Sequence, residues 1–160
     1  MVIVPASISW PNGLPYSNDF GDIYFSVDDG LAEKDYVFLQ ANHLAQRFAA
    51  LAANTSFTIA ETGFGTGLNF LATWQLWQQT RTNGSWLHFV SLEKHPLTPE
   101  DLAHALALWP SLQTYAAKLL AKYPPLTAGW HRLVFAEENL TLTLLLGDAN
   151  ELLPEFVAEV

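Results

Sequence analysis

"FTIAETGFGTGLNF", residues 57–70, is an apolar run that ends in an acid and is followed by three glycines on alternate positions. The apolar part is short and partly β-branched, which predicts a buried strand. From Gly67 on, apolar side chains recur at helical spacing, which predicts a helix that begins inside the glycine loop. A strand, a glycine loop and a helix in this order are typical of a parallel α/β sheet, where ligands bind at the carboxyl ends of the strands.

The spacing of the glycines narrows the class of ligand. Gly63, Gly65 and Gly67 form the pattern G-x-G-x-G, whereas the dinucleotide fingerprint is G-x-G-x-x-G and a phosphate-binding P-loop ends in Gly-Lys-Ser/Thr. Glu61 stands just before the loop, where its charge would repel a pyrophosphate and attract a cation. S-adenosylmethionine satisfies both conditions, because its amino group suits Glu61 and its carboxylate can lie near the loop amides.

Acids also stand at the ends of two further apolar runs. Glu93 ends "WLHFVSLE", residues 86–93, and Asp148 follows "LTLLLG", residues 142–147. At the carboxyl edge of a parallel sheet, Glu93 is placed to accept both hydroxyls of a ribose, and Asp148 to accept the exocyclic amine of adenine. NAD sites and S-adenosylmethionine sites share the first feature, so Glu93 predicts a nucleoside without choosing between them. Taken alone, either acid is more typical of a solvated strand end or a helix cap.

The remaining sequence patterns predict one α/β domain over residues 1–160 with a mostly parallel sheet. The other expected elements are an irregular lead-in over residues 1–30 with one strand-like piece at Ile23–Val27, one or two helices over 31–51, helical material over 99–123 interrupted at Pro110, two strands within 130–148, and a last helix from Ala149. Phe70, Leu71, Trp74 and Trp77 are expected to pack rather than to bind a cofactor.

The composition excludes several classes of function. Sixteen acidic residues against seven basic ones give a net charge of -9, and Lys and Arg form no run, which argues against tight nucleic-acid binding by this chain alone. The chain has no cysteine, which excludes disulfides, thiolate metal sites and thiol nucleophiles. No apolar stretch approaches the roughly 18 residues of a membrane span, so we expect a cytoplasmic protein.

Two further chemistries find no support in the sequence. The five histidines show no metal-ligand spacing, so we expect no metal site. No serine stands in a G-x-S-x-G elbow, so a hydrolase is not indicated.

With these residues in view, the chain resembles the methyltransferase domain of the MnmC family, the bifunctional tRNA 5-methylaminomethyl-2-thiouridine biosynthesis proteins, and its single-domain relatives. The resemblance covers nearly the whole chain. Its matching stretches are residues 19–44, 57–74, 87–112 and 123–154. The glycine-loop segment and the segment around "YFSVDDGLAEKDYVFLQAN" are more specific than a generic methyltransferase loop.

The resemblance implies a class I, Rossmann-like fold and transfer of a methyl group from S-adenosylmethionine to the amine of 5-aminomethyl-2-thiouridine at the wobble position of tRNA. It also assigns roles by position. These are contacts to the methionine part by Glu61, Gly63, Gly65 and Gly67, to the ribose by Glu93, to adenine by Asp148 and Ala149, and closure over the cofactor by Tyr24, Phe25, Ser26, Glu33 and Asn42.

The sequence departs from the family after the last expected helix. Relatives continue with a strand that ends in a motif of the type D-A-W-F-L-D-G-F, which holds the expected catalytic Asp, and then complete the sheet. This chain stops at Val160. The resemblance therefore predicts the cofactor-binding, N-terminal portion of the domain, with an incomplete sheet, the edge of the "FTIAE" strand unpaired, and poor stability of the chain alone.

The difference from the family after the last expected helix also affects which partners we expect. We expect the catalytic residue and most tRNA recognition to lie outside residues 1–160. FAD belongs only to the oxidoreductase domain that is fused to bifunctional relatives, and that domain or an equivalent partner protein is expected beside this one.

Two other functions remain open from the sequence. One is a nucleoside-binding module that keeps the fold without the chemistry, which binding of S-adenosylmethionine without methyl transfer would indicate. The other is an NAD-dependent oxidoreductase, against which the glycine spacing and Glu61 both count.

Overall fold

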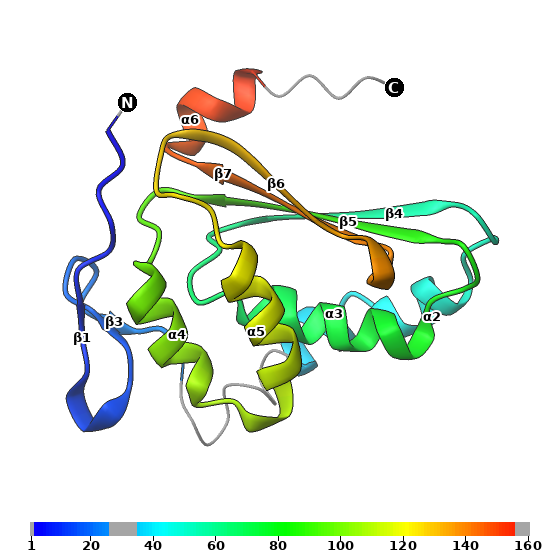
Figure 1. Ribbon diagram of the computed structural model, residues 1–160, viewed down its shortest axis with the longest axis horizontal. Coiled ribbons are helices and arrows are strands. Elements are labelled where there is room, and N and C mark those ends of the chain that lie inside the picture. The colour runs from blue at the N-terminus through cyan, green and yellow to red at the C-terminus, as the bar shows by residue number, and fades with distance from the viewer. Residues whose placement is uncertain (1, 26–34, 156–160) are drawn as a thin grey trace.

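The computed structural model describes residues 2–25 and 35–155 of the chain (Figure 1). Its main sheet has four strands in the order β4-β5-β7-β6. They are β4 (Ser56–Thr62), β5 (Trp86–Glu93), β7 (Leu140–Leu146) and β6 (Gly129–Phe135). The pairs β4–β5 and β5–β7 are parallel, and β6 runs antiparallel to β7. The predicted α/β class with a mostly parallel sheet is confirmed.

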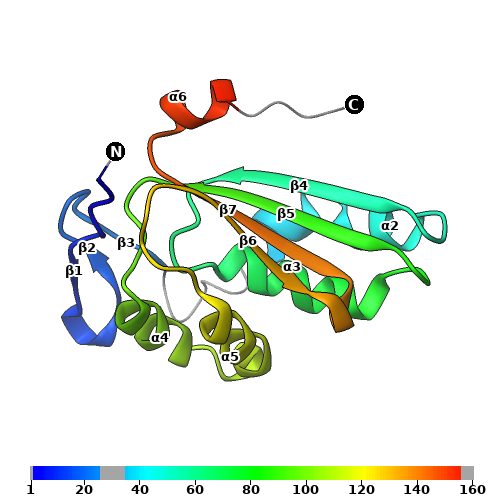
Figure 2. The same cartoon turned by 45° about the horizontal axis from the view of Figure 1, so that its top comes forward.

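The helices α2 to α5 lie on one face of this sheet, and α6 lies on the other side, beside the end of β7 (Figures 1 and 2). Their bounds are α2 Leu44–Ala49, α3 Leu68–Thr80, α4 Pro99–Ala107, α5 Gln113–Lys122 and α6 Ala149–Leu152. A π-helix, η2 (Asp35–Gln40), precedes α2, and a short 3-10 turn, η3 (Pro110–Leu112), separates α4 from α5. This turn begins at the proline that the sequence marks as the interruption.

The helix ends follow from local chemistry. Helix α3 begins directly after Gly67, which has the left-handed φ of 70° that glycine adopts without strain. Helix α4 begins after Thr98, whose side chain accepts a hydrogen bond from the backbone N–H of Asp101, and Pro99 occupies its first turn. Both helices start where the sequence predicts.

The core lies between the sheet and helices α2 to α5. Phe70, Leu71, Trp74 and Trp77, all on α3, have no exposed surface, as expected. Trp74 packs against Phe135 of β6 with 4.3 Å between the ring centroids. Burial of each such side chain stabilises the fold by about 1.5–3 kcal/mol before entropic costs are counted, so α3 is the main packing element under the sheet.

The lead-in is more ordered than the sequence predicts. Three two-residue strands, β1 (Ile8–Ser9), β2 (Tyr16–Ser17) and β3 (Asp22–Ile23), form a small antiparallel sheet. The expected strand-like piece at Ile23–Val27 coincides with β3 only at Ile23, and residues 26 and 27 lie outside the described residues. The stacking of Trp10 on His104 of α4, 3.8 Å between ring centroids, holds this sheet against the domain.

The helices α2 to α5 cover one face of the main sheet and leave side chains of β6 on the other face exposed. In β6, Leu133 and Phe135 are buried toward the helices. The alternate residues Trp130, Arg132 and Val134 are exposed on the opposite side.

Within residues 2–25 and 35–155, no helix is long and apolar enough to cross a membrane.

Candidate functional site

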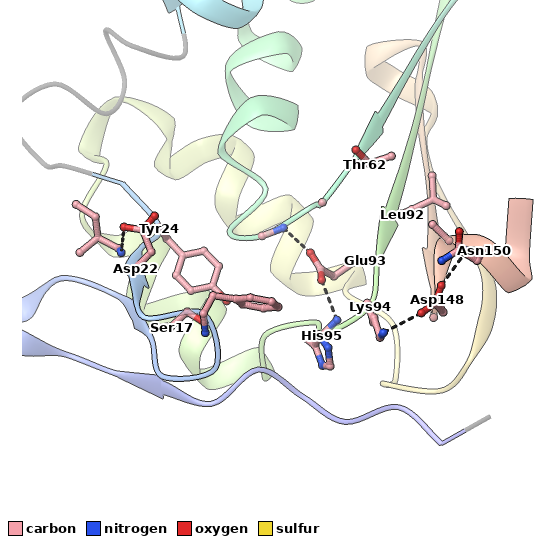
Figure 3. Close-up of a pocket in the computed structure, with 16 residues that line it drawn as sticks. Ser17, Asp22, Tyr24, Thr62, Leu92, Glu93, Lys94, His95, Asp148 and Asn150 are labelled. Carbon is pink, nitrogen blue, oxygen red and sulfur yellow. Dashed lines mark hydrogen bonds and ion pairs between the residues drawn. The ribbon is translucent and has the colours of Figure 1, made fainter.

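A cavity of about 570 Å³ lies at the carboxyl ends of the three parallel strands. Its walls come from the segments that follow β4, β5 and β7 and from the small N-terminal sheet, as Figure 3 shows. The volume is in the range of small-molecule sites, and the position is the one at which open α/β sheets bind ligands.

Glu93, at the end of β5, connects two walls of this cavity. Its Oε2 atom accepts a hydrogen bond of 2.8 Å from the backbone N–H of Gly65, and its Oε1 atom accepts one of 2.8 Å from the N–H of His95 (Figure 3). The structure thus brings the predicted ribose acid and the glycine loop together. Because a carboxylate offers about four acceptor positions, two remain for a ligand.

The three glycines of the loop have different surroundings. All have positive φ, namely 85° at Gly63, 53° at Gly65 and 70° at Gly67. A Cβ at Gly63 would meet nothing within 4 Å, whereas one at Gly67 would lie 2.7 Å from the Phe64 ring. Gly63 and Gly65 line the cavity, and Gly67 does not. Gly67 is therefore required by packing and by the start of α3.

The backbone N–H groups of these glycines are already bonded within the protein. Gly63 donates to the carbonyl of Leu92 at 2.8 Å, Gly65 to Glu93, and Gly67 to the carbonyl of Phe64 at 2.8 Å. A ligand carboxylate near the loop, as the sequence predicts for S-adenosylmethionine, would need donors other than these three. A pyrophosphate would in addition face the charge of Glu93.

Glu61 lies beneath the loop and is not among the residues that line the cavity. Its Oε1 accepts a hydrogen bond of 2.9 Å from Ser91 on β5, and its Oε2 accepts one of 3.1 Å from Asn69 on α3. In this geometry Glu61 ties β4, β5 and α3 together below the glycine loop.

Asp148 and Ala149 line the cavity where the sequence predicts an adenine contact. Asp148 Oδ2 forms an ion pair of 2.8 Å with Lys94 Nζ, and Oδ1 accepts the N–H of Asn150 at 2.9 Å, which caps α6 (Figure 3). The hydrogen bonds from Lys94 and Asn150 lower the pKa of Asp148, and the same bond to Asp148 raises the pKa of Lys94. Lys94 follows Glu93 directly, but no sequence pattern assigned it a role.

The residues expected to close over the cofactor are distributed differently. Tyr24 lines the cavity, and a Cβ at Gly65 would lie 3.5 Å from its ring. Burial, followed by the charge of Glu93, raises the pKa of Tyr24 to about 12, so Tyr24 is neutral at physiological pH. Phe25 is buried against Trp109, with 5.0 Å between ring centroids.

Asn42 does not reach this cavity. Its side chain donates to the carbonyl of Phe38 at 2.8 Å and lines a separate cavity beside β4 with Arg47 and Phe57. Ser26 and Glu33, the other two expected closure residues, lie outside the described residues.

The small N-terminal sheet contributes cavity residues that the sequence analysis missed. Ser17, Phe20, Asp22 and Ile23 all belong to the lining. The one available signal was the cluster of turn residues around "SNDFGD", which fits a tight β-turn as well as an irregular segment.

The charges of the lining favour a ligand that carries a positive group. Asp22, Glu93 and Asp148 face the cavity together with Lys94 and His95, and Lys94 is already paired with Asp148. Among the described residues no group of three His, Cys, Asp or Glu side chains is arranged to hold a metal ion. The charges of the lining therefore favour a cationic ligand over an anionic one.

Comparisons with known proteins give a consistent set of relatives. The chain is 56% identical over 155 residues to the tRNA 5-methylaminomethyl-2-thiouridine biosynthesis bifunctional protein MnmC of Chromobacterium violaceum, a match that covers 97% of this chain and 24% of that protein. The protein of the same description from Methylobacillus flagellatus is 53% identical over 150 residues, covering 94% of this chain and 23% of that protein. The chain thus spans about a quarter of the length of these curated relatives. No protein-family model matches the chain.

A solved structure supports the fold independently. The crystal structure of MNMC2 from Aquifex aeolicus superposes with a TM-score of 0.63 at 20% sequence identity, covering 96% of this chain and 46% of that one. At this identity the likeness concerns the fold alone, which is Rossmann-like α/β.

Proposed function

Since the chain matches a segment of the MnmC bifunctional tRNA-modification proteins, we propose that it is the S-adenosylmethionine-binding portion of a tRNA methyltransferase. The reaction is transfer of a methyl group to the amine of 5-aminomethyl-2-thiouridine at the wobble position, which yields the 5-methylaminomethyl-2-thiouridine of the relatives' name. Residues 1–160 act as one cofactor-binding domain of a cytoplasmic enzyme.

The observation that carries the proposal is the link between Glu93 and Gly65 in a nucleoside-sized cavity. A carboxylate held at the end of the second parallel strand has acceptor positions left for ribose hydroxyls. The same carboxylate occupies the Gly65 amide, which a dinucleotide site would offer to a pyrophosphate. S-adenosylmethionine, which has no phosphate and a positive charge, fits this chemistry better than NAD.

The residues that would hold the cofactor divide by the part of the ligand they face. Glu93 would bind the ribose, Asp148 and Ala149 the adenine, and the open backbone at Gly63 and Gly65 the methionine part. Gly67 and Glu61 keep the loop in shape, and Glu61 adds negative charge below the expected position of the ligand's amino group.

The bound cofactor supplies an electrophilic methyl group on a sulfonium. What the chain's own residues contribute is binding and orientation, so that the methyl group faces the incoming amine in line. The amine must be neutral to attack, and we propose that its proton acceptor, and most of the tRNA contacts, come from parts of the relatives that this chain does not span. Tyr24 and residues of the N-terminal sheet border the same cavity.

Calorimetric titration tests the cofactor assignment. We expect S-adenosylhomocysteine to bind the chain and NAD to show no binding at the same concentration. Preferential binding of NAD would overturn the assignment. Transfer of a labelled methyl group to undermodified tRNA then tests the reaction, and cofactor binding without transfer in the complete protein would identify a non-catalytic module.

A further inference from the structure

An exposed aromatic ring lies at the opening of the candidate cofactor cavity. Phe20 lines this cavity, yet 71% of its surface is exposed, although phenylalanine is usually buried. Among the described residues its one ring contact is with His95, which lines the same cavity, in an edge arrangement with 5.9 Å between ring centroids. Most of the phenyl ring is therefore available to a ligand.

The turn that carries Phe20 is fixed by hydrogen bonds. The buried Oγ of Ser17 accepts the backbone N–H of Phe20 at 3.2 Å, and the carbonyl of Ser17 accepts the N–H of Gly21 at 2.9 Å. Gly21 has a φ of 66°, which glycine adopts without strain. Asp19 accepts the N–H of Ser7 at 3.1 Å, which ties the turn to the first segment of the chain. The backbone thus holds Phe20 in place while its ring stays exposed.

The parts of the cofactor do not account for this ring. In Figure 3, Ser17 and Tyr24 lie on one side of Glu93, and Asp148 lies on the other. Phe20 belongs to the side of Ser17, to which its N–H is bonded. With the adenine at Asp148 and the ribose at Glu93, the adenine does not reach this side, and the methionine part has no planar group to stack on a ring.

The charges of the lining favour an RNA base over the RNA backbone beside Phe20. Asp22, Glu93 and Asp148 line the cavity, and Lys94 is already paired with Asp148. Such a lining repels phosphates and attracts a base that carries an aminomethyl group, because an aliphatic amine is protonated at neutral pH. Unpaired bases of RNA loops are commonly bound by stacking on an aromatic side chain.

We propose that Phe20 binds the acceptor base, so that the wobble 2-thiouracil, turned out of the anticodon loop, stacks on the exposed phenyl ring and directs its aminomethyl group into the cavity. Enzymes that modify a base take it out of its stack in this way. The identity of the base rests on the proposed function. The small N-terminal sheet would then serve the acceptor, and the strand ends the cofactor.

The experiment removes the ring and the base separately. Two fluorescein-labelled RNA hairpins have the sequence of an anticodon arm, one with 5-aminomethyl-2-thiouridine and one with an abasic residue at the wobble position. Anisotropy at low salt measures their binding to the 160-residue chain without cofactor. We expect Phe20→Ala to lower the affinity for the intact hairpin about 5- to 150-fold, the effect of one lost base–aromatic stack. The abasic hairpin should bind the wild type and Phe20→Ala equally, because the partner of the ring is missing.

Two further substitutions separate stacking from apolar contact. Phe20→Trp keeps a flat ring and should retain the affinity, whereas Phe20→Leu keeps apolar bulk without a ring face and should lose most of it. The matched control is Val4→Ala, at another exposed apolar side chain of the lead-in, which is 61% exposed and outside the cavity lining. It should bind both hairpins as the wild type does. Melting temperatures show that each variant is folded.

Four outcomes would overturn the assignment of Phe20. They are an unchanged affinity of Phe20→Ala for the intact hairpin, an equal loss with the abasic hairpin, an equal loss in Val4→Ala, and no detectable binding of the intact hairpin by the wild type. An equal loss with the abasic hairpin would mean that the ring contacts the RNA elsewhere or supports the fold.

Binding of S-adenosylhomocysteine separates this inference from the proposed function. Phe20→Ala should bind it as the wild type does, and a loss would instead place the ring against the cofactor. If the affinity for RNA depends on both Phe20 and the wobble base but the wild type binds no S-adenosylhomocysteine, the base contact stands and the methyltransferase assignment fails. If the cofactor binds while the intact and abasic hairpins are bound equally well, the proposed function stands and the base contact fails.

Discussion

Glu93 is the residue on which the candidate site depends most directly, because it holds the glycine loop and retains acceptor positions for a ligand. We expect Glu93→Ala to lower the affinity for S-adenosylhomocysteine about 10- to 100-fold, since hydrogen bonds to a charged group contribute about 1.5–3 kcal/mol. Calorimetry measures the change. Glu100→Ala, at an exposed acid in the first turn of α4, is the matched control and should bind normally. Unchanged affinity in Glu93→Ala would place the ribose elsewhere.

Substitutions at Gly63 and Gly67 should have different effects, the first on ligand binding and the second on packing. Both have positive φ, so alanine at either position costs about 1–2 kcal/mol. At Gly67 the new Cβ also meets the Phe64 ring at 2.7 Å, and overpacking adds about 1–3 kcal/mol. Chemical denaturation should therefore rank Gly67→Ala as the less stable variant. Gly63→Ala should instead lose cofactor affinity, because its Cβ enters the cavity; the reverse ranking would contradict the geometry.

At the residue scale, the sequence predicts the part of the site that lies at strand ends. Gly63, Gly65, Glu93 and Asp148 lie around one cavity because the ends of parallel strands share an edge, a rule that needs no knowledge of side-chain packing. Asn42 lies in the turn between η2 and α2 and lines another cavity, and no periodicity indicates the direction of such a turn. Its assignment rested on the family resemblance alone.

At the scale of elements, the pairing of β5 with β7 contains a half-buried histidine. His88 shares a hydrogen bond of 2.8 Å with Thr141, and burial, followed by the charge of Arg132, lowers its pKa below 6.5. The unfolded chain therefore binds a proton more readily than the folded one, and stability present above about pH 6.5 is lost as the pH falls below that value. Melting temperatures at pH 7.5 and 5.5 should differ less in His88→Gln than in the wild type.

The control for this measurement is His43→Asn, at an exposed histidine with positive φ that asparagine adopts readily. It should keep the pH dependence of the wild type. An identical pH dependence in His88→Gln would mean that other groups cause the loss of stability.

The long elements were the most readily predictable from periodicity. The strands β4 to β7 each have seven or eight residues and α3 has thirteen, enough for periodicity to show. The strands β1 to β3 have two residues each, so they leave no periodic signal, and their pairing depends on tertiary contacts such as the stacking of Trp10 on His104. For the same reason, the sequence did not predict the cavity wall that these three strands form.

At the scale of the whole molecule, the charge of -9 sets the strength of RNA binding. Acidic residues outnumber basic ones sixteen to seven, so the chain repels RNA in general, and we expect micromolar or weaker affinity for tRNA at physiological salt. Anisotropy with a complete labelled tRNA measures it. Nanomolar binding by this chain would mean that a larger basic surface exists than the described residues provide. Uncharged dextran of similar size serves as the negative control.

The hydrogen bond from Gly65 to Glu93 has a consequence for the way the molecule responds to its ligand. A ribose that binds Glu93 fixes the carboxylate, and the carboxylate in turn holds the amide proton of Gly65. Deuterium uptake at this single amide should slow when the cavity is filled, whereas uptake at the amide of Gly84, in the turn before β5, should not. The exchange rate of the Gly65 amide proton would therefore show whether a ligand occupies the cavity.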